Sequence, residues 1–302
     1  MRAGAVDLGV IDVLKEPVPE DWDAAVLKAG ATRSREAYRS MLADLDAAIM
    51  MPGATPDHSV YAALQDLMNA GNGRTVHFHW AENGSAFPLP SKPLPPRHVI
   101  DATYQRALLE TNYSDLAAIQ RRFEASMRGQ EIRVTSLLGT DLRFRIGDRP
   151  VNFQDGDALA ARASRGVILI DREIELPAGA IRVAPLEESV EGTIVFPVSL
   201  WSGRPVEGLT LLIERGRVVS VTARTGQEAV EAELTGAPEE SRAFREFALG
   251  FNPLLAVPEQ LPWIPYYGYG SGVVRLSLGD NSELGGDVGG DTSVGTSSRT
   301  RQ

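Results

Sequence analysis

From residue 132 onward the sequence is a succession of short segments typical of strands, and this pattern constrains the fold most. Residues 132–147 alternate polar and apolar side chains around a turn at 139–141. Further segments rich in β-branched residues follow at 166–177, 180–185, 192–201, 209–223 and 272–279. Such segments predict β-strands. One clear helix, residues 226–235, interrupts them, so we expect an α+β or mixed α/β fold with a mixed sheet rather than a doubly wound one.

The first part of the chain has a different texture. Residues 21–51 and 59–70 carry apolar side chains at helical spacing, and residues 75–80 (TVHFHW) predict a strand. Two more helical patterns, broken near Asn112 and closed by Gly129, precede the strands. We therefore expect a shortened N-terminal α/β segment with a proline-rich arm, a mixed-sheet domain and a Gly/Ser/Thr-rich tail; their bounds are 1–103, 104–286 and 287–302.

Composition excludes several kinds of site. The sequence has no cysteine, which excludes disulfides, thiolate metal ligands and a cysteine nucleophile. The net charge of −10 and the lack of a basic stripe argue against nucleic acid as a partner. The longest apolar runs are too short to cross a bilayer, and the N-terminus lacks the apolar core of a signal peptide. We expect a cytoplasmic protein with no membrane partner.

One stretch poses a chemical question. Residues 243–255, AFREFALGFNPLL, are almost wholly apolar, yet Arg245 and Glu246 stand side by side within them. An ionised carboxylate is rarely buried without a partner. Adjacent residues of a regular strand face opposite ways, so Arg245 is not the expected partner. Glu246 is therefore a candidate metal ligand, the remnant of one, or a member of a structural ion pair.

Four blocks of the sequence resemble, in the same order, the C-terminal catalytic domain of the aminopeptidase T family of metallopeptidases. The blocks are EIRVTSLLGTDLRFRIGDRPVNFQDGD, AIRVAPLEESVEGTIVF, VEGLTLLIERGRVVSVTARTG and FREFALGFNP. The resemblance covers residues 104–286 and implies the fold of that domain and a homodimer.

The family binds two metal ions through carboxylates and histidines, and most of these ligands are missing. The resemblance implies a glutamate where PAGAIRVAP has Ala180, and a second glutamate that REFALG keeps as Glu246. It implies a histidine where RLSLG has Arg275, and a closing histidine and aspartate where NSELGGD has Gly285 and Asp287. A dinuclear site needs several ligands to hold ions about 3.5–4 Å apart. We expect no dinuclear aminopeptidase and no resident cofactor.

Two histidines offer an alternative metal site. His77 and His79 are two residues apart on a predicted strand, so both imidazoles face the same side. With a third ligand they would bind one iron or zinc ion, and Glu82 and Glu246 are the candidates. Asp287 is a further weak candidate ligand. The 2,5-dihydroxypyridine dioxygenases, kin of aminopeptidase T, hold one metal through two histidines and an aspartate, but the corresponding histidine places are empty here.

An aromatic segment and an arginine complete the set of candidates. Residues 263–272, WIPYYGYGSG, are expected to bind substrate through Trp263, Tyr266, Tyr267 and Tyr269, or else to seal the core or a dimer contact. Arg275 either pairs with Glu246 in place of a metal or receives a substrate carboxylate while Glu246 acts as a base.

These observations leave three functional hypotheses. The first is a metal-free protein that acts on a peptide or an amino-acid-derived substrate, such as a tailoring step in ribosomal peptide natural-product biosynthesis, with Glu246 and Arg275 as catalytic residues. The second is an inactive pseudo-peptidase that binds a peptide or a partner protein. The third is a mononuclear-metal enzyme that uses His77 and His79.

Overall fold

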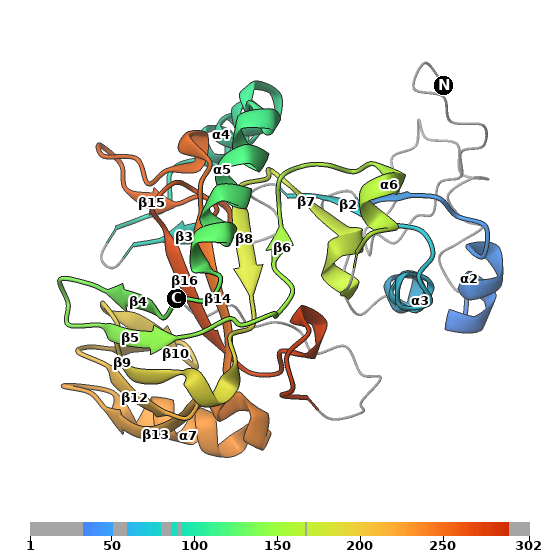
Figure 1. The fold of residues 1–302 in the computed structure, drawn as a ribbon. Coiled ribbons are helices and arrows are strands. Elements are labelled where there is room, and N and C mark those ends of the chain that lie inside the picture. The colour runs from blue at the N-terminus through green and yellow to red at the C-terminus, as the bar shows by residue number, and fades with distance from the viewer. Residues whose placement is uncertain (1–32, 51–58, 80–85, 90–91, 167, 290–302) are drawn as a thin grey trace.

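The computed structural model describes residues 33–50, 59–79, 86–89, 92–166 and 168–289 (Figure 1). The helical pattern over 21–51 therefore lies partly outside the described residues; within them residues 35–41 form a helix, whereas residues 48–50 form a strand, which corrects the prediction there. The candidate ligand Glu82 and the tail from residue 290 onward also lie outside them. Within the described residues no helix is long and apolar enough to cross a membrane.

The N-terminal part contributes two strands to a small parallel sheet. Helix α2 (Arg35–Met41) begins at Ser34, whose hydroxyl accepts from the backbone of Ala37. Strand β1 (Ala48–Met50), helix α3 (Ser59–Asn69) and strand β2 (Thr75–Phe78) follow as a parallel crossover. The third strand, β7 (Glu173–Leu176), comes from the C-terminal part and pairs with β2. The sheet thus crosses the boundary expected at residue 103.

The C-terminal part contains two antiparallel sheets. The four-stranded sheet has the order β16-β14-β8-β6, formed by β16 (Val274–Leu278), β14 (Phe244–Gly250), β8 (Ala180–Val183) and β6 (Asn152–Phe153). The five-stranded sheet has the order β13-β12-β9-β5-β4, formed by β13 (Arg217–Thr222), β12 (Thr210–Glu214), β9 (Glu191–Val195), β5 (Asp141–Phe144) and β4 (Ile132–Thr135).

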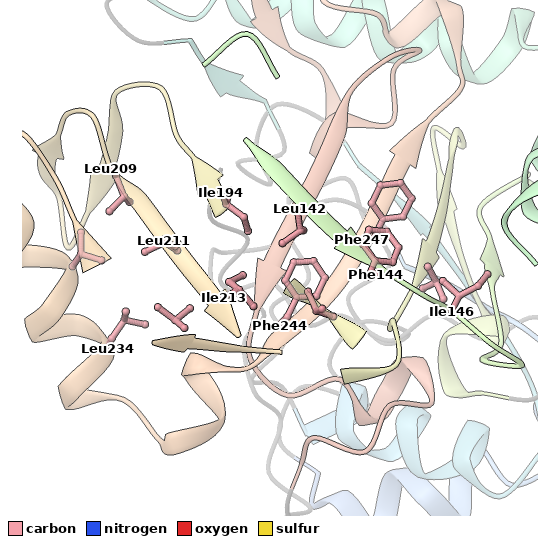
Figure 2. Packing of buried hydrophobic residues seen from close by; sticks show 14 of the residues in the cluster. Leu142, Phe144, Ile146, Ile194, Leu209, Leu211, Ile213, Leu234, Phe244 and Phe247 are labelled. Carbon is pink, nitrogen blue, oxygen red and sulfur yellow. The ribbon is translucent and has the colours of Figure 1, made fainter. Parts of the chain in front are cut away.

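The main hydrophobic core lies between these two sheets. Figure 2 shows Leu142 and Phe144 of β5 packed near Phe244 and Phe247 of β14, with further apolar side chains from β12 beside them. Phe144 and Phe247 have ring centroids 5.1 Å apart. Helix α7 (Gln227–Gly236) covers the far end of this core. This packing holds β14 rigidly and buries both of its faces.

The remaining elements surround the sheets. Helix α4 (Arg97–Glu110) is followed by α5 (Tyr113–Met127), which begins where Asn112 accepts from the backbone of Asp115. A second core cluster joins α4 to the aromatic segment and includes Tyr104, Trp263 and Tyr266. The short elements are α6 (Ala160–Ala163), the pair β10 (Ser199–Trp201) and β11 (Arg204–Val206), the pair β3 (Phe87–Pro88) and β15 (Trp263–Ile264), and the 3-10 turns η5 (Pro253–Leu255), η6 (Tyr266–Gly268) and η7 (Ser282–Leu284).

The structure confirms the mixed architecture predicted from the sequence. The helical patterns around Asn112, the helix near 59–70 and the helix near 226–235 all form, and the alternating segments become strands. The fold is a mixture of helices and several sheets, as expected for an α+β protein.

Candidate functional site

Glu246 lies on the central part of β14, on a face that two arginines reach from the flanking strands. In the strand register, Arg182 of β8 and Arg275 of β16 both stand opposite Ala248 of β14. Glu246 is two residues from Ala248 and so projects from the same face. The small side chain of Ala248 leaves room for both guanidinium groups to converge on the carboxylate.

Both oxygens of Glu246 are engaged. Arg182 donates from Nε to Oε1 at 2.9 Å and from Nη2 to Oε2 at 3.1 Å, a bidentate pair. Arg275 donates from Nη2 to Oε1 at 2.5 Å. The side chain of Glu246 is 3% exposed, and those of Arg182 and Arg275 are each 10% exposed. The site is therefore a buried ion cluster.

Arg245 also belongs to this cluster, which corrects the expectation from strand alternation. The register of β14 with β16 shifts between Phe244 and Glu246, so Arg245 lies at a β-bulge. Its Nε lies 3.8 Å from Oε2 of Glu246, and its guanidinium donates to Glu283 of η7 and to the backbone oxygen of Asp280. The prediction that neighbours on this strand face apart was wrong because the strand is irregular here.

The charges around Glu246 fix its protonation state. Burial alone would raise the pKa of its carboxyl group, but Arg182 and Arg275, helped by Arg245, hold that pKa well below its ordinary range. A carboxylate in this state is a poor proton acceptor. The arrangement is that of buried ion pairs, and it does not favour the alternative in which Glu246 is free to act as a base.

Glu175 of β7 extends the cluster toward the aromatic segment. Its Oε2 accepts from the hydroxyls of Tyr266 at 2.8 Å and Tyr269 at 2.5 Å, and its Oε1 lies 3.9 Å from Nη1 of Arg182. Burial would raise the pKa of Glu175, but Arg182 and the two tyrosine hydroxyls contribute to lowering it to about 2. This carboxylate is thus charged at neutral pH, and both of its oxygens have partners.

The aromatic segment is mostly interior. Trp263, Tyr266 and Tyr269 are each at most 1% exposed, whereas Tyr267 is half-buried. The guanidinium of Arg275 lies 5.9 Å from the ring centroid of Tyr269. Three of the four predicted substrate-binding residues are therefore buried, as in the alternative in which this segment seals the core, and Tyr267 is the one of the four that is partly exposed.

His77 and His79 share a face, as predicted, but within the described residues no third ligand joins them. Their rings are nearly parallel, with centroids 6.2 Å apart. Nε2 of His77 is hydrogen-bonded to the hydroxyl of Thr75 at 2.9 Å, and burial lowers the pKa of His77 to about 4. Burial also lowers the pKa of His79, whose two ring nitrogens have no hydrogen-bond partner.

Glu173 is a further buried acid that sequence reasoning missed. It stands two residues before Glu175 on the same face of β7, opposite Thr75 of β2. Burial raises the pKa of Glu173, as do the charges of Glu283 and Glu175, to about 8. Its Oε1 is out of contact with solvent and has no hydrogen-bond partner, while Tyr61 of α3 bonds the carboxyl group. Glu173 therefore holds a proton at neutral pH.

The residues at the family's ligand positions do not fit a dinuclear metal site. Ala180 and Gly285 have no ligand atom, and Gly285 has φ +76°, with Pro150 2.8 Å from where a Cβ would stand. Asp287 is 83% exposed and pairs with Arg149 at 2.6 Å. Within the described residues no group of three or more His, Asp or Glu side chains is placed to hold a metal ion. The groups that contact the carboxylate of Glu246 are the guanidinium groups of Arg182 and Arg275.

The most important residue missed from the sequence is Arg182. It lies two positions after Ala180 in PAGAIRVAP, so it faces the same side of β8 as the implied ligand position. That spacing was a usable signal. The pair of glutamates in REIEL, at alternate positions of one strand, was a second signal for Glu173 and Glu175.

Part of the sequence matches a known family, and the fold is similar to two solved structures. Residues 113–254 match the family described as thermophilic metalloprotease (M29). The fold is similar to AmpT from Thermus thermophilus, with a TM-score of 0.54 and 19% identity over 82% of this chain and 66% of that one. It is also similar to 2,5-dihydroxypyridine dioxygenase from Pseudomonas putida KT2440, with a TM-score of 0.53 and 17% identity over 84% of this chain and 65% of that one.

This chain spans about two thirds of the length of each of these two structures, 66% and 65%. No curated protein matches the sequence. The family match and the two similar folds confirm the resemblance to aminopeptidase T that the sequence blocks indicated. Over residues 113–254 the chain is thus similar to the thermophilic metalloprotease family, and its fold is similar to that of AmpT.

Proposed function

We propose that this chain is a metal-independent relative of the thermophilic metalloproteases that binds a peptide or an amino-acid-derived ligand without hydrolysing it. One observation carries the proposal: Glu246, which stands where the family resemblance implies a metal ligand, is bound at both oxygens by Arg182 and at one by Arg275. Guanidinium groups thus supply the positive charge that a metal ion supplies in a metallopeptidase.

Two physical arguments favour binding over hydrolysis. A metal that displaced the arginines would have to leave two buried guanidinium groups without their carboxylate, which is strongly unfavourable. A water molecule activated without metal would need a proton acceptor, and the pKa of Glu246 is held too low for that role. The geometry therefore supports the pseudo-peptidase hypothesis best.

The ligand class follows from the family similarity and from Tyr267, the one partly exposed residue among the four aromatic residues Trp263, Tyr266, Tyr267 and Tyr269. The family description names a protease, whose substrates are peptides. Tyr267 is half-buried on the turn η6, where its ring contacts Phe87 of β3 with centroids 5.4 Å apart. Tyrosine offers a large apolar face with a polar tip, which suits an exposed peptide side chain or a planar group.

A second candidate is a metal-free enzyme on the same substrate class, including a tailoring step in ribosomal peptide biosynthesis. The observation that favours it is the neutral imidazole of His79, whose ring nitrogens are unpaired. A neutral imidazole is able to accept a proton from a bound substrate. This candidate shares the binding site of the first and differs from it in turnover.

The test combines metal content, peptide hydrolysis and peptide binding on the full chain. Elemental analysis of the wild type, of Glu246→Ala and of the double variant His77→Ala/His79→Ala is expected to find no stoichiometric metal. Aminoacyl-anilide substrates with added zinc, cobalt or manganese are expected to remain uncleaved, whereas a peptide panel is expected to raise the melting temperature of the wild type.

Each contrary outcome points to a different function. Near-stoichiometric iron or zinc that is lost in the histidine double variant would revive the mononuclear-metal hypothesis. Metal lost only in Glu246→Ala would revive a peptidase. Consumption of a peptide without added metal would favour the second candidate.

The homodimer implied by the family resemblance stays a prediction, which light scattering on the same samples would check.

A further inference from the structure

His79 stands out among the buried polar groups of the described residues because neither of its ring nitrogens has a hydrogen-bond partner. Both nitrogens are out of contact with solvent, although the side chain as a whole is only half-buried. A neutral imidazole has one donor and one acceptor, and buried polar groups of folded proteins are nearly always paired. An imidazole left wholly unpaired therefore costs stability and calls for an explanation.

The neighbours of His79 do not supply a partner. Its ring lies against Tyr266, with centroids 4.8 Å apart, and edge-on to Tyr267, with centroids 6.0 Å apart. The hydroxyl of Tyr266 already donates to Glu175. His77, by contrast, uses its Nε2 for a bond to Thr75. The two histidines share one face of the sheet but differ in this respect, which makes His77 a matched comparison.

The turn that contains Tyr266 and Tyr267, next to the ring of His79, has a strained backbone. Tyr266 and Tyr267 have φ angles of +36° and +47°, in the left-handed region that non-glycine residues rarely adopt. Two hydrogen bonds of Tyr266 hold the turn. Its backbone N–H donates to the hydroxyl of Tyr104 at 3.0 Å, and the hydroxyl of Tyr266 donates to Glu175. Strain of this kind gathers at ligand sites, where the surrounding structure enforces it.

We propose that His79 is the contact point for the peptide of the proposed function, and that Tyr267 covers the imidazole until the peptide enters. The ligand class is an uncharged peptide or amide, because its carbonyl oxygen accepts from the imidazole N–H and an amide N–H donates to the other ring nitrogen. Binding would give both ring nitrogens of His79 a hydrogen-bond partner and would let the turn at Tyr267 relax. The same event would thus remove the cost of the unpaired imidazole and the backbone strain. This inference rests on the proposed function for its ligand class.

The charge states of His79 and Glu175 favour an uncharged ligand. Burial lowers the pKa of His79, so the imidazole is neutral at physiological pH and presents one donor and one acceptor. Glu175, the acid whose charge acts on His79, is already bonded by two tyrosine hydroxyls and lies near Arg182. Glu175 is therefore not free to bind an ammonium group of a ligand.

The first arm of the test needs no ligand. In the apo protein, His79→Phe removes two unpaired nitrogens and is expected to raise the melting temperature by about 1–4 °C. The matched variant His77→Phe loses the bond to Thr75 and is expected to lower it. A melting temperature of His79→Phe that falls as far as that of His77→Phe would show that His79 is a structural residue and would overturn the proposal.

The second arm measures affinity for a pooled set of N-acetylated tripeptide amides by calorimetry. We expect binding to the wild type, a loss of at least about tenfold in His79→Phe and a smaller loss in His79→Asn, which keeps a donor and an acceptor. Equal affinity in His79→Phe would overturn the assignment to His79 but leave the proposed function standing. No binding to the wild type would overturn the proposed function and the ligand class together.

A third arm tests the cover. Diethyl pyrocarbonate modifies neutral imidazoles, and the modified residue is identified by mass spectrometry of digested protein. Tyr267→Gly, which accepts the left-handed conformation without strain and removes the ring, is expected to speed modification of His79 several-fold. Exposed His98 on α4 should react at the same rate in both proteins. An unchanged rate at His79 would show that Tyr267 does not cover it.

Discussion

Arg182 and Glu246 form a bidentate ion pair between two neighbouring strands, β8 and β14, that are buried on both faces. The two donor–acceptor distances are 2.9 and 3.1 Å, and the pair is nearly out of contact with solvent. Such a pair has two consequences. It determines the charge state of the site, and it makes each partner depend on the other, because a buried charge without its counter-ion is costly.

Replacing Glu246 should therefore destabilise the fold severely. Glu246→Gln removes the charge that Arg182, Arg245 and Arg275 share, and we expect a loss of about 3–5 kcal/mol in the free energy of unfolding. Urea denaturation followed by circular dichroism measures this loss. The exposed residue Glu110 offers a matched control, for which Glu110→Gln should change stability by no more than about 0.5 kcal/mol. Similar small changes in both variants would mean that the cluster contributes little.

Stability should fall in mild acid because of Glu175. Its pKa is lowered from 4.5 to about 2 in the folded protein, so its contribution is fully present above the unfolded value and is lost as pH falls from about 4.5 through about 2. Glu175→Gln should lower stability near neutral pH and flatten the acid limb of the profile. Glu188→Gln, at a side chain 78% exposed, should leave that limb unchanged. An acid limb of equal slope in all three proteins would contradict the assignment.

Stability should also fall toward alkaline pH because of Glu173. Its pKa is raised from 4.5 to about 8, so the folded state binds a proton that the unfolded state has lost. The contribution is fully present below the unfolded value and disappears as pH rises through about 8. Glu173→Gln, which mimics the protonated acid, should melt higher than the wild type at pH about 9. The exposed Glu214→Gln is the control and should track the wild type.

Restoring a family ligand at one position should not restore metal binding. Arg275→His places a histidine where the family resemblance implies one, but Arg182 still occupies both oxygens of Glu246. After incubation with zinc, cobalt or manganese and dialysis, we expect no bound metal in Arg275→His or in the control Arg275→Gln. Stoichiometric metal in the histidine variant alone would show that Arg182 yields to a cation, contrary to the proposed function.

Local pattern sufficed for much of the fold. The helix α7 follows from the helical spacing of residues 226–235, and the strand β2 follows from its β-branched and aromatic residues. The capping role of Asn112 was visible as a break between two helical patterns. These features depend on interactions within a few residues, and a single sequence records those interactions directly.

The candidate site could be predicted only in part, because its contacts are non-local. The pairing of Arg275 with Glu246 was anticipated from the family positions, and it forms. The role of Arg182 depends on β8 lying beside β14, residues 64 positions apart in the chain. The presence of Arg245 in the cluster depends on a bulge, which breaks the alternation on which the prediction relied.

The place of β7 has a consequence for how the chain unfolds. Although it follows the helices α4 and α5 in sequence, β7 is hydrogen-bonded to β2 and is a strand of the N-terminal parallel sheet. Its Glu175 meanwhile reaches Tyr266 and Tyr269 in the C-terminal part. One strand is thus bonded to both parts of the chain, through its backbone to β2 and through Glu175 to Tyr266 and Tyr269. The two parts should therefore melt in a single cooperative transition, with the protein behaving as one thermodynamic unit.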